Sequence, residues 1–185
     1  PIREEKSAIF IVPRVYRGGR DITILVMLSP WYITGLIEGE GCFCITISKH
    51  KTKRLGFDPR MMFEVEMIIE DKPLLEKLQA SLGCGQIYVL SYFRYGWRPH
   101  AKFAVKSHKD IFGKLIPFFK KYPLQGKKRK DFEYFCKASE IFLSKEHLTK
   151  EGIEKLREIQ SRMNLRKKLK WSSARVRENR APGGD

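Results

Sequence analysis

The sequence has no apolar run long enough to cross a membrane. Its most apolar stretch, ITILVML at residues 22–28, is far shorter than the roughly 20 residues that a membrane-spanning helix requires. This stretch also lacks the three-part build of a secretory signal peptide. We therefore expect no membrane partner for this chain.

Cysteine is scarce, and its spacing excludes the common closed zinc sites. The four cysteines, Cys42, Cys44, Cys84 and Cys136, contain no C-x-x-C pair and no tetrahedral ligand pattern. Cys42 and Cys44 are two residues apart on an expected strand, so they share a face but are poorly placed to bond each other. Free thiols in a reducing compartment are the expectation.

Acidic residues are few beside basic ones. The chain of 185 residues has 37 Lys and Arg against 21 Asp and Glu, which gives a formal net charge of +16. A surplus of this size favours a polyanionic partner, either nucleic acid or an anionic membrane surface. Composition alone also allows a soluble basic protein with no such partner. The length suits one ordinary domain with a hydrophobic core.

The first strong structural signal is a helix followed by two strands. Ser29 is a good N-cap and Pro30 suits the first helical position, so a helix is predicted to start here and to end in a glycine-rich stretch. Apolar residues then alternate with polar ones along residues 42–50 and 61–69, which is typical of strands buried on one face.

A second helix and hairpin follow, and the rest of the chain is helical. We expect Asp71 to cap a helix that stops at Gly83, and residues 86–106 to form a hairpin. The predicted fold class is α+β, with an antiparallel sheet covered by helices on one face. Residues 1–28 are expected to be an N-terminal extension, 29–164 the domain, and 165–185 a basic C-terminal tail prone to disorder.

The uncovered face of this sheet is rich in cationic and hydroxyl side chains. A curved β-ribbon of this kind can lie in the major groove of DNA. Every sheet buried on one side has a solvated polar face, however, so polarity alone does not distinguish a DNA interface from ordinary surface.

Two glutamates, Glu38 and Glu40, lie at the glycine-rich end of the first helix. A helix C-terminus carries partial negative charge, and two neighbouring carboxylates repel each other. A divalent cation would offset the negative charge of the helix end and the repulsion between the carboxylates. Mg²⁺ prefers such hard oxygen ligands. The alternative is that both acids are simply exposed near a helix end. Gly35 and Gly39, four residues apart, would let another backbone approach this helix closely, either from the chain's own core or from a second copy.

Residues 33–41, ITGLIEGEG, resemble the nine-residue signature of the LAGLIDADG homing endonucleases, with glycines at its third and last positions and acids at its sixth and eighth. Three further segments resemble the family in the same order, at residues 71–88, 116–135 and 147–164. The resemblance implies the family's αββαββα core, with a four-stranded, curved antiparallel sheet and helices packed on one face.

Only one signature is present, and single-signature members of this family are homodimers. The resemblance therefore implies a homodimer whose signature helices pack at the two-fold axis, with Thr34, Gly35 and Glu38 at the dimer interface. A two-fold protein should prefer a pseudo-palindromic site.

Catalytic roles follow from the resemblance by position. Glu40 matches the metal-binding acid, and the backbone carbonyl of Gly39 would be a further metal ligand. Lys128, favoured over Lys127, matches the basic residue that polarises water or stabilises the developing charge. The implied cofactor is Mg²⁺, with Mn²⁺ or Ca²⁺ able to substitute for binding. Glu38 is expected to be structural.

The family's polar residue that positions water lies on the second strand, where this sequence departs from the pattern. The register there offers Met67 or Ile68, with Glu66 beside them. The departure leaves that role unassigned.

DNA recognition would fall to the sheet, and phosphate contacts to basic residues nearby. Phosphate contacts are expected from Lys127, Arg129 and the tail, so binding should weaken steeply with salt. The candidate base-reading residues are Ser48, His50, Lys51, Lys53, Tyr92, Arg94, Arg98, His100 and Lys102.

The resemblance implies a site-specific double-strand DNA endonuclease of intron homing. It would cleave a long pseudo-palindromic site by metal-dependent hydrolysis and leave 3′ overhangs. An RNA-binding intron maturase, with intron RNA as partner, or a non-cleaving DNA-binding regulator is the alternative on the same scaffold. A generic basic α+β domain explains the charge but not the four ordered segments. By family analogy the origin is an organelle, either chloroplast or mitochondrion.

Overall fold

The structure is a computed structural model, and it describes residues 27–92, 96 and 98–163. Arg94, most of the expected N-terminal extension and the whole C-terminal tail lie outside these described residues. The helices and strands run in the order α1 (Pro30–Glu40), β1 (Gly41–Lys49), β2 (Phe57–Ile68), α2 (Lys72–Leu82), β3 (Gln86–Leu90), β4 (His100–Val105), α3 (His108–Asp110), α4 (Ile116–Lys121), α5 (Lys128–Leu143) and α6 (Lys150–Arg162).

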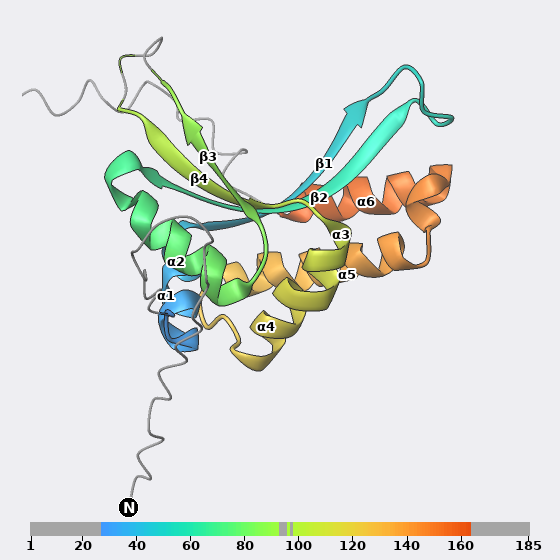
Figure 1. The fold of residues 1–185 in the computed structure, drawn as a ribbon. Coiled ribbons are helices and arrows are strands. Elements are labelled where there is room, and N and C mark those ends of the chain that lie inside the picture. Colours follow the sequence, from blue (N-terminus) through green and yellow to red (C-terminus); the bar gives the residue numbers. More distant parts are fainter. Residues whose placement is uncertain (1–26, 93–95, 97, 164–185) are drawn as a thin grey trace, which may run out of the picture.

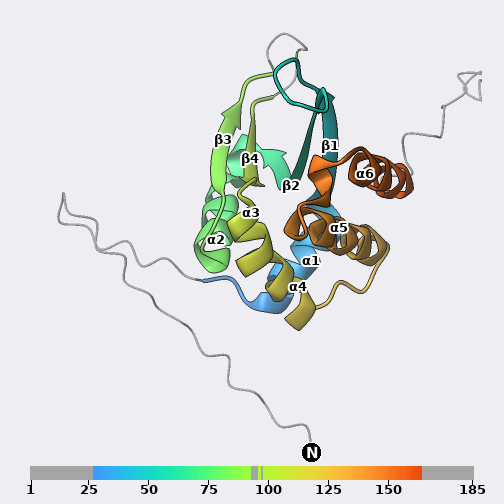
Figure 2. The same ribbon diagram turned by 90° about the vertical axis from the view of Figure 1, so that its right-hand side faces the viewer.

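The four strands form one antiparallel sheet in the order β1-β2-β4-β3. In Figure 1 the two hairpins rise on either side of a central saddle, and the helices gather beneath it. Figure 2, turned by 90°, shows the helices on the same side of the sheet. The predicted fold, a four-stranded curved sheet with helices packed on one face, is therefore confirmed.

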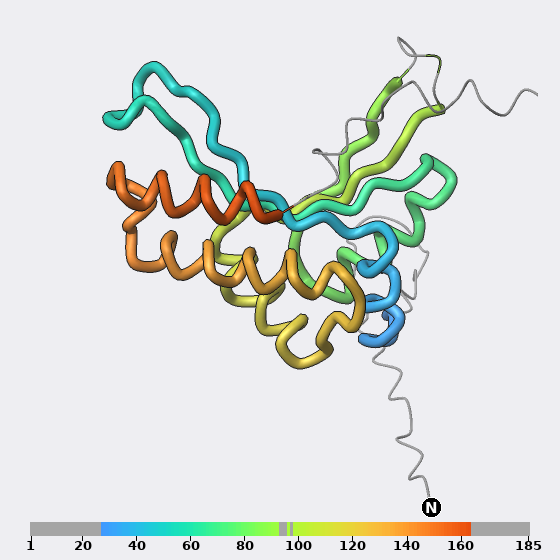
Figure 3. The backbone as a smooth tube through the Cα atoms, turned by 180° about the vertical axis from the view of Figure 1, so that it is seen from behind, coloured from blue at the N-terminus to red at the C-terminus, as the bar shows by residue number. Residues whose placement is uncertain are grey.

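Helix α6 extends the helical layer along the first hairpin. Figure 3 shows α5 and α6 running side by side below β1 and β2. The Gln160 side-chain amide donates to the Ile45 carbonyl on β1 at 2.7 Å, and Arg54 in the hairpin turn donates to the Leu148 carbonyl just before α6. These contacts support the part of the first hairpin that projects beyond the main core.

The start of α1 follows the sequence prediction closely. Ser29 is the N-cap, its hydroxyl accepts from the Tyr32 amide at 3.2 Å, and Pro30 opens the helix. At the other end Gly41 begins β1 directly, with no connecting loop. A β carbon at Gly41 would lie 2.4 Å from the Ile37 side chain, so only glycine permits this close passage from helix to strand.

The predicted cap at Asp71 is wrong in its chemistry. Residues Ile69–Asp71 form a turn of 3₁₀ helix that leads straight into α2, and the Asp71 side chain makes no capping hydrogen bond. The 3₁₀ turn supplies its own backbone bonds, so α2 begins without the side-chain cap. The predicted end at Gly83 is correct, because this glycine adopts the left-handed conformation with φ of +63°.

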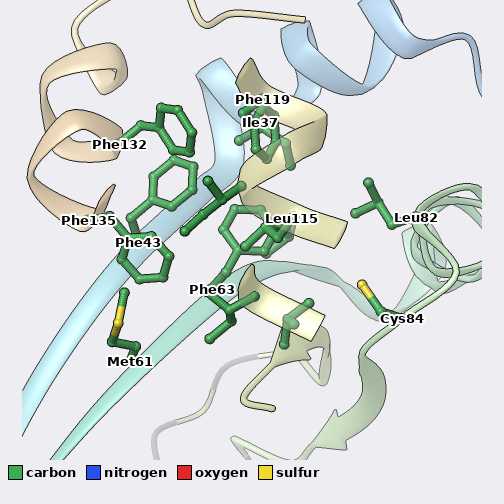
Figure 4. Close-up of a cluster of buried hydrophobic side chains, with 14 of the residues drawn as sticks. Ile37, Phe43, Met61, Phe63, Leu82, Cys84, Leu115, Phe119, Phe132 and Phe135 are labelled. Carbon is green, nitrogen blue, oxygen red and sulfur yellow. The ribbon is translucent and has the colours of Figure 1, made fainter. Parts of the chain in front are cut away.

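The core lies between the sheet and the helices and is dominated by phenylalanine. Phe43 on β1 is at its centre, with ring centroids 5.0–5.7 Å from those of Phe63, Phe119, Phe132 and Phe135. Figure 4 shows these rings packed together between β1, β2 and the helices. The alternation predicted for both strands is confirmed, because Phe43, Ile45, Phe63 and Val65 are all buried.

The packed domain begins slightly before the predicted boundary at residue 29. The Leu28 amide donates to the Ser81 hydroxyl on α2 at 2.9 Å, and the Leu28 side chain packs against the core. Within residues 27–92, 96 and 98–163, no helix combines the length and apolar character needed to span a bilayer.

We predict that Phe43→Ala lowers the free energy of unfolding by about 3–5 kcal/mol, because it leaves a cavity facing four aromatic rings. Leu143→Ala on α5 is the control: this side chain is 62% exposed, and the change should stay within about 0.5 kcal/mol. Urea denaturation followed by circular dichroism measures both. Equal losses in the two variants would show that the aromatic cluster does not dominate the core.

Candidate metal and nucleic-acid site

The candidate metal site is the junction between α1 and β1. Glu40 is the last residue of α1, and its side chain is exposed. Among the described residues it makes no hydrogen bond or ion pair. A carboxylate left open at the negative end of a helix is unfavourable on its own, so Glu40 is well suited to receive a cation.

Glu38, two residues earlier, faces the chain itself. Its carboxylate oxygen Oε1 accepts two backbone hydrogen bonds from the loop before α5, one from the Gln125 amide at 2.5 Å and one from the Gly126 amide at 2.8 Å. A β carbon at Gly126 would come within 2.9 Å of the same carboxylate, so glycine allows the close approach. The expectation that Glu38 is structural fits this geometry.

Lys128, the first residue of α5, makes a second set of hydrogen bonds between the same two segments. Its ammonium donates to the backbone carbonyls of Glu38 at 3.0 Å and Gly39 at 2.8 Å. The last carbonyls of a helix lack partners within the helix and carry its negative dipole end. Lys128 satisfies two of them with a positive charge.

We call these reciprocal contacts of Glu38 and Lys128 the α1–α5 lock. Four hydrogen bonds join the end of α1 to a segment some ninety residues later in the chain. The lock fixes the end of α1 against the start of α5. It therefore places two of the residues that were predicted from sequence to be catalytic, Glu40 and Lys128, at the same corner of the molecule.

The donor set at this corner suits a hard cation that keeps part of its water shell. Glu40 offers an open carboxylate, and the Gly39 carbonyl has a second lone pair beside the one that Lys128 uses. The described residues contain no cluster of three or more His, Cys, Asp or Glu that could enclose a metal. Mg²⁺ needs no such cage, because it binds through one or two carboxylates, waters and substrate phosphates.

Two other basic residues of this stretch lie outside the lock. Lys127 is exposed immediately before α5. Arg129 is also exposed and forms an ion pair with Glu133 on its own helix at 3.0 Å. The structure thus brings Lys128, rather than Lys127, to the carbonyls next to Glu40.

The predicted dimer seam needs a correction at Thr34. This side chain is only 4% exposed, and its hydroxyl donates to the Tyr122 carbonyl of its own chain at 3.1 Å. Glu38 likewise uses its carboxylate inside the chain. Gly35 and Gly39, in contrast, lie on the exposed side of α1, and a β carbon at either would meet no atom within 4 Å.

The uncovered face of the sheet carries an acidic cluster that the sequence analysis did not identify. Lys102 on β4 lies between two carboxylates of β2, 3.5 Å from Glu64 and 3.0 Å from Glu66. The Tyr92 hydroxyl donates to Glu66 at 2.7 Å. Lys102 was predicted as a base-reading residue, and its charge is offset by its neighbours across the strands.

These contacts shift the ionisation of all three groups. Partial burial would raise the pKa of Glu66, but hydrogen bonds from Tyr92 and Lys102 outweigh it and hold that pKa below its ordinary value. Burial would lower the pKa of Lys102, but its bond to Glu66 and the nearby carboxylates raise it overall. The hydrogen bond to Glu66 raises the pKa of Tyr92. The shifts favour the charged forms of Glu66 and Lys102 and the neutral form of Tyr92.

The candidates for a water-positioning residue lie on opposite faces of β2. Met67 is packed against the core on the helix side. Ile68 shares the uncovered face but is apolar and exposed. Glu64 and Glu66 are the acidic residues of β2 on that face nearest these candidates, and Glu64 pairs with Cys42, two residues after Glu40. The strict alternation along β2 was the signal that could have drawn attention to Glu64.

The other predicted DNA contacts gather at the ends of the two hairpins. Lys51 and Lys53 lie exposed in the β1–β2 turn, with Ser48 and His50 next to them on the chain. Lys53 is 3.9 Å from Asp58, and Arg98 is 4.0 Å from Glu70, which are weak contacts for exposed pairs. His100 opens β4, and its Nδ1 lies 2.9 Å from the Arg98 carbonyl.

Cys42 and Cys44 approach each other on the uncovered face of β1. Their Sγ atoms are 3.2 Å apart, a close non-covalent contact that the sequence did not predict, although the two cysteines are not bonded to each other. The hydrogen bond from Cys44 lowers the pKa of Cys42 to about 7, and the same bond raises the pKa of Cys44. All four cysteines are free thiols.

Comparison with known proteins gives a consistent set of relatives. The family model described as LAGLIDADG endonuclease matches residues 33–139. A probable intron-encoded endonuclease 3 of Neurospora crassa is 32% identical over 131 residues, which is 71% of this chain and 24% of the relative.

Two solved structures illustrate the structural similarity. The meganuclease I-SmaMI, bound to uncleaved DNA target in the presence of calcium ions, has a TM-score of 0.67 at 31% identity, covering 83% of this chain and 49% of its own. The homing endonuclease I-TnaI has a TM-score of 0.69 at 29% identity, covering 75% of this chain and 90% of its own. The chain thus spans about a quarter of the Neurospora relative and half of I-SmaMI.

We predict that Glu38→Ala lowers the free energy of unfolding by about 1–3 kcal/mol, because the Gln125 and Gly126 amides lose their acceptor. Glu133→Ala, which removes an exposed ion pair with Arg129, should change it by less than about 0.5 kcal/mol. Urea titration of both variants tests the lock. A Glu38→Ala loss no larger than that of Glu133→Ala would show that the lock contributes nothing to stability.

Proposed function

Because the chain belongs to the LAGLIDADG endonuclease family, we propose that it is a site-specific DNA endonuclease that hydrolyses both strands of its target. One observation carries the proposal: the exposed Glu40 follows directly after Gly39, whose backbone carbonyl accepts a hydrogen bond from Lys128. A structural acid would be expected to have a partner in its own chain, as Glu38 does. Glu40 has none among the described residues.

The proposed cofactor is Mg²⁺, held by the Glu40 carboxylate and the Gly39 carbonyl. The calcium ions present with I-SmaMI and its uncleaved DNA support a divalent cation at this kind of site. When bound, the cation would lower the pKa of a water molecule and stabilise charge on the scissile phosphate. Mn²⁺ would serve in its place, and Ca²⁺ would support binding.

Lys128 would hold the end of α1 in the free protein and stabilise negative charge on DNA during cleavage. Its ammonium lies 2.8 Å from the Gly39 carbonyl oxygen, which the cation would share. Because the two positive charges repel, we expect Lys128 to turn from this carbonyl towards a phosphate oxygen in the DNA complex. Its anchorage on Glu38 and Gly39 keeps it within reach of that position.

The DNA would lie along the uncovered face of the sheet, because the helices cover the other face; the similar protein I-SmaMI also binds DNA. Cationic groups at the two hairpin ends, including Lys51, Lys53 and Arg98, would contact the major groove on either side of the centre. Lys127 and Arg129 would contact phosphates. The Glu64–Lys102–Glu66 cluster lies between the hairpin ends, and its carboxylates would accept from base amino groups rather than approach phosphates.

A second copy of the chain would complete the site, because one Glu40 serves one strand. The exposed side of α1 supports this proposal: Gly35 and Gly39 leave it flat, while Trp31 is 58% and Tyr32 50% exposed. Large aromatic side chains beside small residues suit a close helix–helix contact. Nearly the whole I-TnaI chain, 90%, matches this single unit. A homodimer would favour a pseudo-palindromic target.

An intron in an organelle genome is the proposed origin, and the name of the Neurospora relative supports the intron. Cohesive ends with 3′ overhangs are the proposed product.

We predict that Gly35→Leu weakens self-association at least about tenfold, equivalent to about 1.4 kcal/mol, because the added side chain fills the seam of α1. Gly113→Leu is the control, since a β carbon there also meets no atom within 4 Å but lies on another helical segment. Sedimentation velocity measures the dimer fraction, and circular dichroism checks the fold. A wild-type chain that sediments as a monomer, or equal effects of both variants, would contradict this interface.

We predict that Glu40→Gln reduces DNA cleavage by at least about 100-fold while DNA binding is retained, because the amide keeps the shape but not the charge that binds the cation. Glu140→Gln, an exposed acid on α5, should cleave like wild type. Duplexes selected by the protein from a random library serve as substrate with Mg²⁺, and mobility shifts with Ca²⁺ measure binding.

Cleavage by Glu40→Gln at the wild-type rate would disprove the metal assignment. If the wild type binds DNA but cuts nothing with Mg²⁺ or Mn²⁺, a maturase or a DNA-binding regulator becomes the better account.

A further inference from the structure

The two thiols of β1 lie in the same part of the molecule as the proposed cleavage site. Cys42 follows Glu40 by two residues, and both cysteines belong to the face of the sheet that the helices leave uncovered. Their side chains are half-buried, whereas Phe43 and Ile45 between and after them point into the core. The pair is therefore reachable from the surface on which DNA would lie.

Their sulfur atoms are closer than strand geometry requires. Alternate residues of a strand are separated by about 6.6 Å along the backbone. The two Sγ atoms are nevertheless only 3.2 Å apart, so both side chains turn towards each other. The backbone separation of about 6.6 Å lies at the upper end of the roughly 4.4–6.8 Å that disulfides bridge, and the β carbons of a disulfide are only about 3.5–4.5 Å apart, so closing the bond would require the strand to bend at Phe43.

The other two cysteines, Cys84 and Cys136, are not close to a second thiol in the described part of the chain. Cys84 is buried in the turn between α2 and β3, and Cys136 lies on α5 in the helical layer. Neither has a sulfur neighbour among the described residues. Only Cys42 and Cys44, within that part of the chain, are arranged to react as a pair.

We propose that Cys42 and Cys44 form an oxidisable thiol pair, which a small-molecule disulfide converts into a disulfide within β1. One cysteine sulfur attacks the oxidant disulfide, forms a mixed disulfide and releases one small thiol. The second cysteine sulfur then attacks the first, closes the bond within the chain and releases the second small thiol. The two cysteine protons end on the two released thiols, so the exchange is balanced.

Formation of the disulfide would displace Glu40. The sulfurs must move from 3.2 Å to about 2.05 Å apart, which draws in the start of β1. Gly41 cannot absorb this movement freely, because its α carbon already passes close to Ile37. The displacement would reach the end of α1, where Glu40 is held. This consequence rests on the proposed function, whereas formation of the disulfide does not.

The chemical test uses the full chain and oxidised glutathione. After incubation, digestion without reductant and mass spectrometry should reveal a peptide with both cysteines that has lost two hydrogen atoms. A Cys84→Ser, Cys136→Ser double variant should give the same peptide. Cys44→Ser should stop at a glutathione adduct on Cys42. The proposal is overturned if Cys42 and Cys44 stay reduced, or if wild type accumulates glutathione adducts without closure.

The functional test follows cleavage of the selected duplex by the same samples. Oxidised wild type should cut at least about tenfold more slowly, and dithiothreitol should restore the rate. The Cys44→Ser variant cannot form the disulfide, so its peptide map should show no disulfide within the chain. Unchanged cleavage by fully closed protein would overturn the link to Glu40. Absence of cleavage in both redox states would instead count against the nuclease function, while the peptide map still decides whether the disulfide forms.

Discussion

The rest of the site depends on the contact between the end of α1 and the start of α5. Glu38 accepts the amides of the loop before α5, and Lys128 donates to the last carbonyls of α1. Each group thereby satisfies backbone atoms that the other segment leaves without a partner. With both ends held, Gly41 can carry the chain from helix to strand without a loop, and Glu40 is left at the exposed corner.

The same arrangement explains why acids occur at the centre of a strongly basic chain. The Glu38 carboxylate accepts hydrogen bonds from the backbone, so it holds the end of α1 in place and is not available to bind a cation. Glu64 and Glu66 share one cation, Lys102, so their negative charge is only partly balanced while the hairpin ends stay cationic. Glu40 alone of these four lacks a cationic or hydrogen-bonding partner among the described residues. Its charge is the one available for a divalent cation at DNA phosphates.

Local patterns predicted the fold well because they are encoded within a few residues. Ser29 and Pro30 start α1, and the alternation along β1 and β2 correctly separated buried from uncovered side chains. What sequence could not predict are contacts between distant segments. Nothing near Thr34 indicates that Tyr122 accepts from it, and nothing near Lys102 indicates the two carboxylates across the strands. The approach of Cys42 to Cys44 was missed for another reason, since side-chain rotamers, rather than the strand repeat, bring the sulfurs together.

The central claim is that the α1–α5 lock presents Glu40 to a divalent cation at the DNA backbone. A crystal structure of the chain with a selected duplex and Mn²⁺, examined for anomalous scattering, tests it directly. The account predicts an Mn²⁺ peak at the Glu40 carboxylate and a DNA phosphate, with Glu38 still bonded to the amides of Gln125 and Gly126. A peak at Glu64 and Glu66 instead, with Glu40 turned to solvent, would contradict it.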